Sequence, residues 1–212
     1  MSAFSAYLAW HRAQLTRAPY TTNIIQSGTL MACGDVVAQA IERDAAKGAP
    51  VPFKASRTLI LASWGGFFNA TFWVAFYRLL HARLPGQTLS WVAAAAAVSP
   101  FFNTAFFSFT ESATHVVNEG WPYRAHERAR LYDKVRGKLD ECLVPTVHRS
   151  LTVWVPFNFF LFTYIPLPLR TLAGSCVGLG WNVYLSLVAA AKGGAAVPLG
   201  SEKVGRSQSA LV

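Results

Sequence analysis

The chain has 212 residues, of which 53% are hydrophobic and only 14% are charged. Soluble domains contain about 45–50% apolar and about 25% charged residues, so this composition, with a mean hydropathy of +0.30, argues against a disordered chain and against an ordinary soluble enzyme. The net charge is +9, and the three cysteines stand far apart without a CxxC pair, so the sequence signals neither a disulfide framework nor a zinc ribbon.

Five apolar stretches follow one another along the chain, separated by short charged breaks. They cover residues 21–41, 58–80, 89–117, 147–165 and 167–191. Each is close to the length of about 20 residues that an α-helix needs to cross the hydrocarbon core of a bilayer. The sequence therefore predicts an all-α integral membrane protein, a bundle of four or five transmembrane helices.

The first stretch is the weakest candidate for a span, because Asn23, Gln26, Asp35 and Gln39 interrupt it. It either crosses the membrane against other helices or lies amphipathically on the surface. The second, fourth and fifth stretches are the cleanest, and the third carries a single acid, Glu111. The choice between four and five spans therefore depends on the first stretch.

The longest polar segment, residues 119–146, mixes six Lys and Arg residues with five Asp and Glu residues. Apolar residues recur in it at spacings of three and four, which places one apolar stripe on a helix; they are Leu131, Val135, Leu139 and Cys142. This pattern predicts a basic amphipathic helix lying at the membrane interface, with its cations facing anionic headgroups. A solvated connector is the alternative.

The distribution of basic residues supports a membrane protein with several spans. If all five stretches cross, 14 Lys and Arg residues fall on one side and 5 on the other, which is the asymmetry of the positive-inside rule. If the first stretch does not cross, the split becomes 16 to 3. Membrane topology thus accounts for the excess charge, so we expect the lipid bilayer and no nucleic acid as the partner.

The two ends of the chain differ from the apolar part. No acid precedes Asp35, and the N-terminal segment carries Arg12 and Arg17, which is the character of a mitochondrial targeting sequence. The Gly-rich, polar residues 192–212 predict a flexible tail. We therefore expect one membrane domain over residues 1–191, followed by this tail.

No catalytic motif is present, and the five histidines show no metal-ligand spacing. The sequence therefore predicts neither an enzyme nor a metal or cofactor site. Small residues do recur at helix-packing spacing, in Gly174-xxx-Gly178 and in the series Ala62, Gly66 and Ala70. Such positions let helix backbones approach closely in lipid, so they indicate a compact bundle and a possible dimer face.

Polar residues within the spans are the main functional candidates. Gly28, Ala32, Asp35 and Gln39 share one face of the first predicted helix. A carboxylate at membrane depth is costly and therefore indicates a functional site by default. This face is a candidate lining for an aqueous path, with Gln26 and with polar groups on neighbouring helices, namely Asn103, Glu111 and Asn158. Alternatively, Asp35 caps a helix end near the interface or pairs with a buried arginine.

Several motifs in order resemble the Mpv-seventeen/PMP-twenty-two family of small mitochondrial and peroxisomal membrane proteins, over residues 7–186. The resemblance includes Pro19, a Gly34-Asp35 pair followed by Gln39, and Ser99-Pro100. It is most specific in the closing block, which contains Trp154, Pro166, Arg170, Trp181 and Tyr184. The resemblance is to a divergent member, since the family's Gly-Pro falls on Ala70-Thr71, its following His on Val74 and its Asp-Gln on Ala94-Ala95.

The resemblance implies residence in the mitochondrial inner membrane or, alternatively, in the peroxisomal membrane. It also implies conduction of small solutes, so we expect a poorly selective channel involved in membrane homeostasis. Asp35 is then expected to set the local charge of the pore, so that Asp35→Asn shifts ion selectivity toward anions. The alternative is a non-conducting structural, assembly or accessory subunit of an inner-membrane complex. The protein is expected to form homo-oligomers or to join a larger membrane complex.

Overall fold

The computed structural model describes residues 3–46, 51–86, 88–165 and 167–190, and this part of the chain is a bundle of helices without a strand. The helices are α1 (Ala3–Arg17), α2 (Pro19–Ala45), α3 (Ala55–Ser63), the π-helical segment η1 (Trp64–Asn69), α4 (Ala70–Arg83), α5 (Thr88–Glu119), α6 (Ala125–Tyr164) and α7 (Leu167–Ala190). The predicted tail, residues 192–212, lies outside the described residues. The all-α fold class is confirmed.

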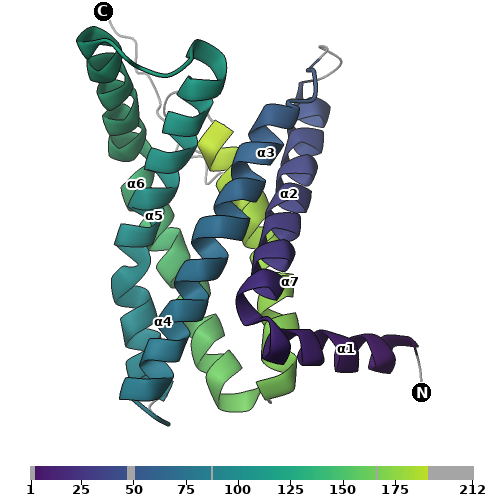
Figure 1. Ribbon diagram of the computed structural model, residues 1–212. Coiled ribbons are helices and arrows are strands. Elements are labelled where there is room, and N and C mark those ends of the chain that lie inside the picture. Colours follow the sequence, from purple (N-terminus) through teal and green to yellow (C-terminus); the bar gives the residue numbers. More distant parts are fainter. Residues whose placement is uncertain (1–2, 47–50, 87, 166, 191–212) are drawn as a thin grey trace, which may run out of the picture.

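Five lengthwise elements run alternately up and down the bundle (Figure 1). They are α2, the continuous run α3–η1–α4, α5, α6 and α7, and each packs against its neighbours in a closed ring. Helix α1 instead runs sideways at one end of the bundle and projects away from it (Figure 1). We call this the α1 end; the connection 120–124, the last residues of α2 and the first residues of α3 lie at the opposite end.

Three helical runs of the described chain are long and apolar enough to cross a membrane, namely Pro19–Ala45, Ala55–Leu80 and Thr88–Glu119. The first contains the stretch that the sequence marks as weakest. The fourth stretch, in α6, is not apolar enough to be counted with them, because His148, Arg149 and Asn158 lower its mean hydropathy. The prediction that the first stretch is the weakest candidate for a span and the fourth one of the cleanest was therefore wrong. Both stretches nevertheless run lengthwise in the bundle.

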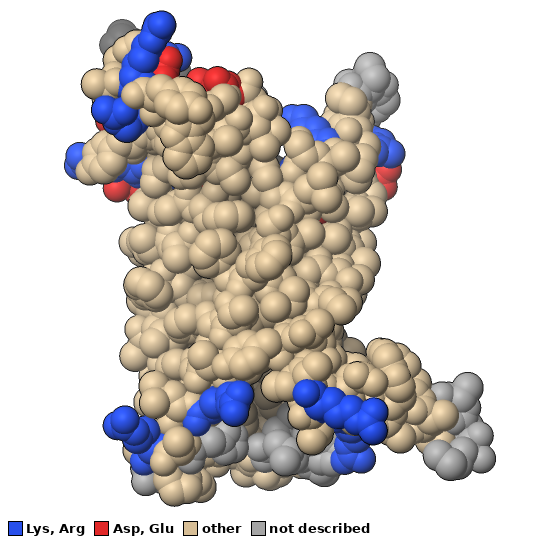
Figure 2. All heavy atoms as spheres, in the orientation of Figure 1, with Lys and Arg blue, Asp and Glu red and all other residues tan. Residues whose placement is uncertain are grey.

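Charged side chains gather at the two ends, and a wide uncharged band separates them (Figure 2). Large apolar side chains point outward from this band, including Leu59, Phe67 and Phe101, each more than half exposed. In water such a surface would be unfavourable, whereas lipid tails solvate it. The band is therefore the lipid-facing surface of an integral membrane bundle.

The basic segment 119–146 does not form a separate interfacial helix. After the turn at Gly120, its residues from Ala125 onward are the first half of α6, which continues without interruption to Tyr164. At about 1.5 Å per residue, a helix of 40 residues is about 60 Å long, twice the hydrocarbon thickness of about 30 Å. The charged half therefore extends beyond the membrane along the bundle axis.

The start of α6 has its own stabilising contact. The Arg124 backbone N–H donates to Glu127 Oε2 at 2.9 Å, which satisfies one of the donors that a helix N-terminus leaves free. This hydrogen bond holds the pKa of Glu127 below its usual range. The polar part of the chain is thus helical from its first residues.

Glycines allow α2 to approach its neighbours closely. A Cβ atom on Gly34 would lie 2.8 Å from Asn182 Cβ on α7, and one on Gly65 would lie 2.7 Å from Met31 Cβ on α2. Both distances are shorter than van der Waals contact. The glycines therefore determine how closely α2 packs against α7 and η1.

We expect Gly34→Ala and Gly65→Ala to lower the free energy of unfolding by about 1–3 kcal/mol each, because the added methyl group overpacks a helix contact. Gly137→Ala in α6 is the matched control, since a Cβ there meets no atom within 4 Å. It should instead stabilise the helix by roughly 0.5–1 kcal/mol. Thermal unfolding in detergent measures both effects, and equal midpoints for all three variants would contradict the close-packing argument.

Candidate functional site

A buried polar cluster around Asp35 joins α2, α3 and α7. The Asp35 side chain is fully buried, and its Oδ1 lies 2.7 Å from Arg57 Nε. Ser186 Oγ donates to the same oxygen at 2.6 Å, while Thr58 Oγ1 donates to Oδ2 at 2.5 Å. Both carboxylate oxygens are therefore engaged by groups from two other helices.

Gln39 and Glu42, further along α2, extend this cluster. Gln39 Nε2 donates to Asp35 Oδ2 at 2.7 Å, and Gln39 Oε1 accepts from the Lys54 backbone N–H at 2.8 Å, at the start of α3. Glu42 forms a two-fold hydrogen bond with Arg57, at 2.7 and 2.9 Å. A buried charge is tolerated when it is paired and fully hydrogen-bonded, so this cluster holds three helices together.

A cavity of about 490 Å³ occupies the other half of the bundle, nearer to the α1 end. Its walls come from α2, η1, α4, α5, α6 and α7. The polar lining consists of amides and hydroxyls, from Asn23, Gln26, Ser27, Asn69, Tyr77, Ser99, Asn103, Ser150, Asn158 and Asn182. Among the described residues that line it, none carries a charge at neutral pH.

Hydrogen bonds across the helices hold several of these polar groups in place. Asn69, the last residue of η1, donates from Nδ2 to Ser27 Oγ at 2.7 Å. On the opposite wall, Ser99 donates to Ser150 Oγ at 3.1 Å, which joins α5 to α6. π-helical turns often occur at functional positions, and here η1 brings Asn69 to the cavity wall.

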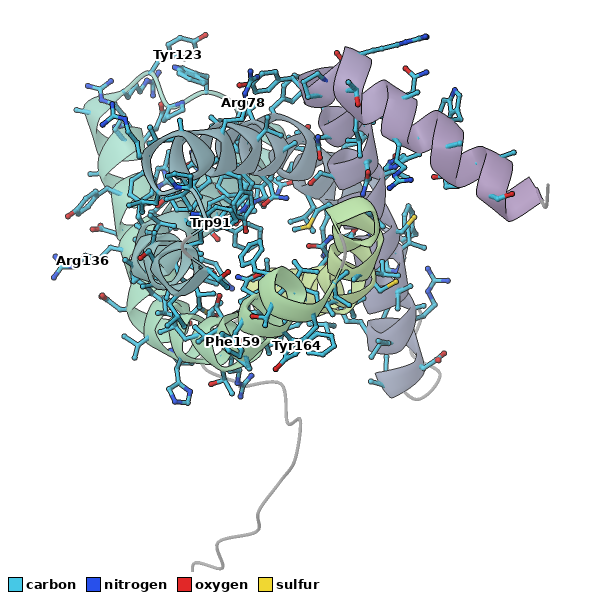
Figure 3. The ribbon with its side chains drawn as sticks, turned by 90° about the horizontal axis from the view of Figure 1, so that it is seen from below. Arg78, Trp91, Tyr123, Arg136, Phe159 and Tyr164 are labelled. Carbon is cyan, nitrogen blue, oxygen red and sulfur yellow. The ribbon has the colours of Figure 1, made fainter. Side chains whose placement is uncertain are left out.

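Aromatic rings form much of the remaining wall, with Trp73, Phe102, Trp154, Phe162 and Trp181 among them. Trp154 and Trp181 meet edge to face, with ring centroids 6.3 Å apart. Viewed from the α1 end (Figure 3), the lengthwise helices surround the centre, while Phe159 and Tyr164 lie on the outside of α6. The bundle thus presents amides and rings inward and apolar rings outward.

The cavity does not extend through the whole bundle. Beyond it, a core cluster closes the centre with Met31, Leu61, Trp64, Phe106, Phe107, Tyr184, Leu185 and Val188. The Asp35 cluster lies at the same level, since Ser186 belongs to this part of α7. The structure is therefore a bundle with an internal chamber that is closed on the side opposite to α1.

The predicted polar candidates fall into separate places. Gln26 and Asn158 line the cavity, whereas Asp35 and Gln39 belong to the buried cluster and are not in the cavity lining. Glu111 is half-buried on α5 and belongs to neither set. For Asp35 the structure has the alternative arrangement, a pair with an arginine, the partly buried Arg57. No group of three or more potential metal ligands occurs among the described residues.

Comparisons with known proteins agree with the resemblance. The model of the Mpv17 / PMP22 family matches residues 128–186. Protein SYM1 of Debaryomyces hansenii is 28% identical over 183 residues, 82% of this chain and 84% of that protein. PXMP2/4 family protein 3 of Dictyostelium discoideum is 27% identical and covers 91% of this chain and 96% of its own length. Peroxisomal membrane protein 2 of Bos taurus is 27% identical, and the match covers 79% of this chain and 82% of that protein.

The chain is similar to the Mpv17 / PMP22 family, through the family model in its closing part and through the relatives over most of its length. It is an organellar membrane protein, and its likeness to the relatives extends over most of the chain rather than over the closing block alone. No solved structure matches it.

The residues that carry the family resemblance have definite structural positions in this chain. Pro19 is the first residue of α2, where its missing N–H costs nothing. Trp154 and Trp181 line the cavity, and the buried Tyr184 lies under the Arg149 guanidinium, 5.5 Å from the ring centroid. Pro166 and the side chain of Arg170 lie outside the described residues.

Several residues of both sites were not predicted as functional residues from the sequence. Arg57, Thr58 and Ser186 complete the Asp35 cluster, and only the contacts between α2, α3 and α7 show this role. Gly174 and Gly178 line the cavity, and a Cβ on either meets no atom within 4 Å. The expected close packing at this pair is therefore not found within the described chain.

Proposed function

We propose that this protein is a poorly selective channel for small, uncharged solutes in an organellar membrane, with the cavity as part of the path. The observation that carries the proposal is the cavity itself: a chamber of about 490 Å³ at the centre of a membrane bundle, with amides and hydroxyls on its walls. In a membrane protein, polar side chains that face inward indicate a water-filled or solute-filled space.

The uncharged lining favours neutral solutes. An ion would leave bulk water for a site of low dielectric without an opposite charge to replace its hydration, which is costly. Amides and hydroxyls instead exchange hydrogen bonds with a neutral polar solute. The aromatic walls around Trp154 and Trp181 supply apolar contact for its carbon atoms.

Conduction requires a second, open conformation. In the present one the core cluster around Phe106 and Phe107 closes the bundle beyond the cavity. Both of these side chains are fully buried, so they must move before a solute can leave the chamber on that side. A closed and an open state in exchange would satisfy this requirement.

We propose the mitochondrial inner membrane as the location, with the peroxisomal membrane as the alternative. The acid-free N-terminal helix with Arg12 and Arg17 favours the former, and the name of the Bos taurus relative favours the latter. Fractionation of cells that express a tagged full-length chain, with marker proteins for both membranes, distinguishes the two.

The channel is tested by swelling of liposomes that contain the purified protein. Under an osmotic gradient of glycerol or erythritol, we expect protein-dependent swelling, and little or none with an organic anion or cation of similar size. Protein-free liposomes are the control. Equal rates with and without folded protein would contradict conduction, and co-migration with a large complex on native gels would then support the accessory-subunit alternative.

A further inference from the structure

The two ends of the bundle differ in how their cations are arranged. At the opposite end, basic residues are paired with acids: Arg57 with Asp35, Lys134 with Glu119, and the exposed Arg136 near Asp140. At the α1 end, the described cations are arginines without a nearby carboxylate: Arg12, Arg17, Arg78 and Arg83. Figure 2 shows blue without red at this end and both colours at the other.

These four arginines are exposed, and none of them forms an ion pair within the described part of the chain. Arg12 and Arg17 lie on α1, while Arg78 and Arg83 lie at the end of α4. Arg78 is positioned over the ring of Tyr20, with its Cζ 6.0 Å from the centroid. A guanidinium group presents a planar fork of donors that matches phosphate oxygens.

Helix α1 has the orientation of a helix that lies in a membrane interface. It runs across the bundle axis at the edge of the uncharged band (Figures 1 and 2). Tyr7 and Trp10 remain 55% and 58% exposed, and amphipathic rings of this kind favour the headgroup region.

Hydrogen bonds attach α1 to α2, among them the following pair. His11 Nε2 lies 2.9 Å from Gln26 Oε1, and Thr22 Oγ1 donates to the Gln14 carbonyl oxygen at 3.2 Å. These contacts hold the outer surface of α1 level with the end of α4. Cations from two helices are therefore presented in one layer, next to exposed rings.

We propose that the α1 end binds the phosphate groups of anionic phospholipids, with α1 lying in the headgroup layer. Four arginines without neighbouring acids create a positive potential that an anionic bilayer surface complements. The bilayer supplies the apolar contact for Tyr7 and Trp10 that water does not. The opposite end lacks such a strong positive potential, because its acids neutralise much of its positive charge.

The test uses the full-length protein in detergent, with phosphatidylglycerol or phosphatidylcholine added, and follows thermal unfolding. We expect phosphatidylglycerol to raise the midpoint more than phosphatidylcholine. Changing Arg12, Arg17, Arg78 and Arg83 together to Gln should remove most of this difference. The matched control changes four exposed arginines of the opposite end to Gln, namely Arg43, Arg128, Arg130 and Arg136, and should keep most of it.

Three results would overturn the proposal: no preference for phosphatidylglycerol in the unmodified protein, equal loss in both fourfold variants, or the same stabilisation by inorganic phosphate. If the first variant does not fold, quenching of tryptophan fluorescence by brominated lipids replaces it. The difference between the unmodified protein and Trp10→Phe isolates Trp10. Stronger quenching of Trp10 by brominated phosphatidylglycerol than by brominated phosphatidylcholine is expected, and equal quenching would contradict the proposal.

Discussion

Replacing Gly178 by leucine is expected to abolish solute flux while the protein remains folded. Gly178 lines the cavity on α7, and a Cβ atom at this position meets no other atom within 4 Å. The Cβ atom of a leucine therefore fits without a clash, and the rest of the side chain is directed to occupy part of the chamber. Leucine is also a better helix former than glycine, so the loss of flux should come with equal or higher stability.

Gly180→Leu is the matched control for this experiment. Gly180 lies two residues further along α7, is exposed, and is not part of the cavity lining. Its substitution should leave the rate of liposome swelling unchanged. If Gly178→Leu and Gly180→Leu conduct equally, the solute does not pass through this cavity, and the proposed path is wrong.

Arg57→Met is expected to lower the free energy of unfolding by about 3–5 kcal/mol, the usual cost of removing one partner of a buried ion pair. The Arg57 side chain is 17% exposed and lies 2.7 Å from the fully buried carboxylate of Asp35. Without it, Asp35 keeps hydrogen bonds from Thr58 and Ser186 but has no opposite charge beside it. The variant should unfold at a clearly lower temperature in detergent.

Two further variants show whether the lost pairing is the cause. Adding Asp35→Asn to Arg57→Met removes the unpaired charge and should recover part of the stability, as a double-mutant cycle would show. Arg130→Met is the surface control, because Arg130 is 60% exposed and 3.9 Å from Glu119. It should cost at most about 1 kcal/mol. Equal midpoints for Arg57→Met and Arg130→Met would contradict the structural role of the Asp35 cluster.

The same geometry changes what is expected of Asp35. A charge on the pore wall would affect ion selectivity, whereas a charge inside a hydrogen-bonded cluster affects stability. Asp35 lies outside the cavity lining and is paired with Arg57. We therefore expect the main effect of Asp35→Asn on the unfolding midpoint rather than on the reversal potential.

Much of the helical pattern could be predicted from the sequence because it depends on local composition. Long apolar runs predict helices of membrane length, and the run from Thr88 to Glu119 is one helix in the structure. The boundary near residue 146 was not predictable in this way. A change from charged to apolar residues marks where the environment changes, and α6 passes through that point without a break.

Hydrogen-bond partners that are distant in sequence could not be predicted from such local patterns. Asp35 and Ser186 are 151 residues apart, yet they share a hydrogen bond of 2.6 Å. Likewise, the spacing of Gly174 and Gly178 is typical of close helix packing, but only the placement of α7 shows that both glycines face a cavity. Helical periodicity tells which residues share a face and not what that face contacts.

The amino-acid sequence by itself determined that this protein is a helical membrane bundle that resembles a known family, because hydropathy and ordered motifs are properties of the chain. The tertiary structure alone decided which polar residues stabilise the bundle and which line its cavity. The physical reason is that a buried polar group must find a partner, and the partner is supplied by whichever helix packs beside it. For Asp35 that is Arg57, and for Asn69 it is Ser27.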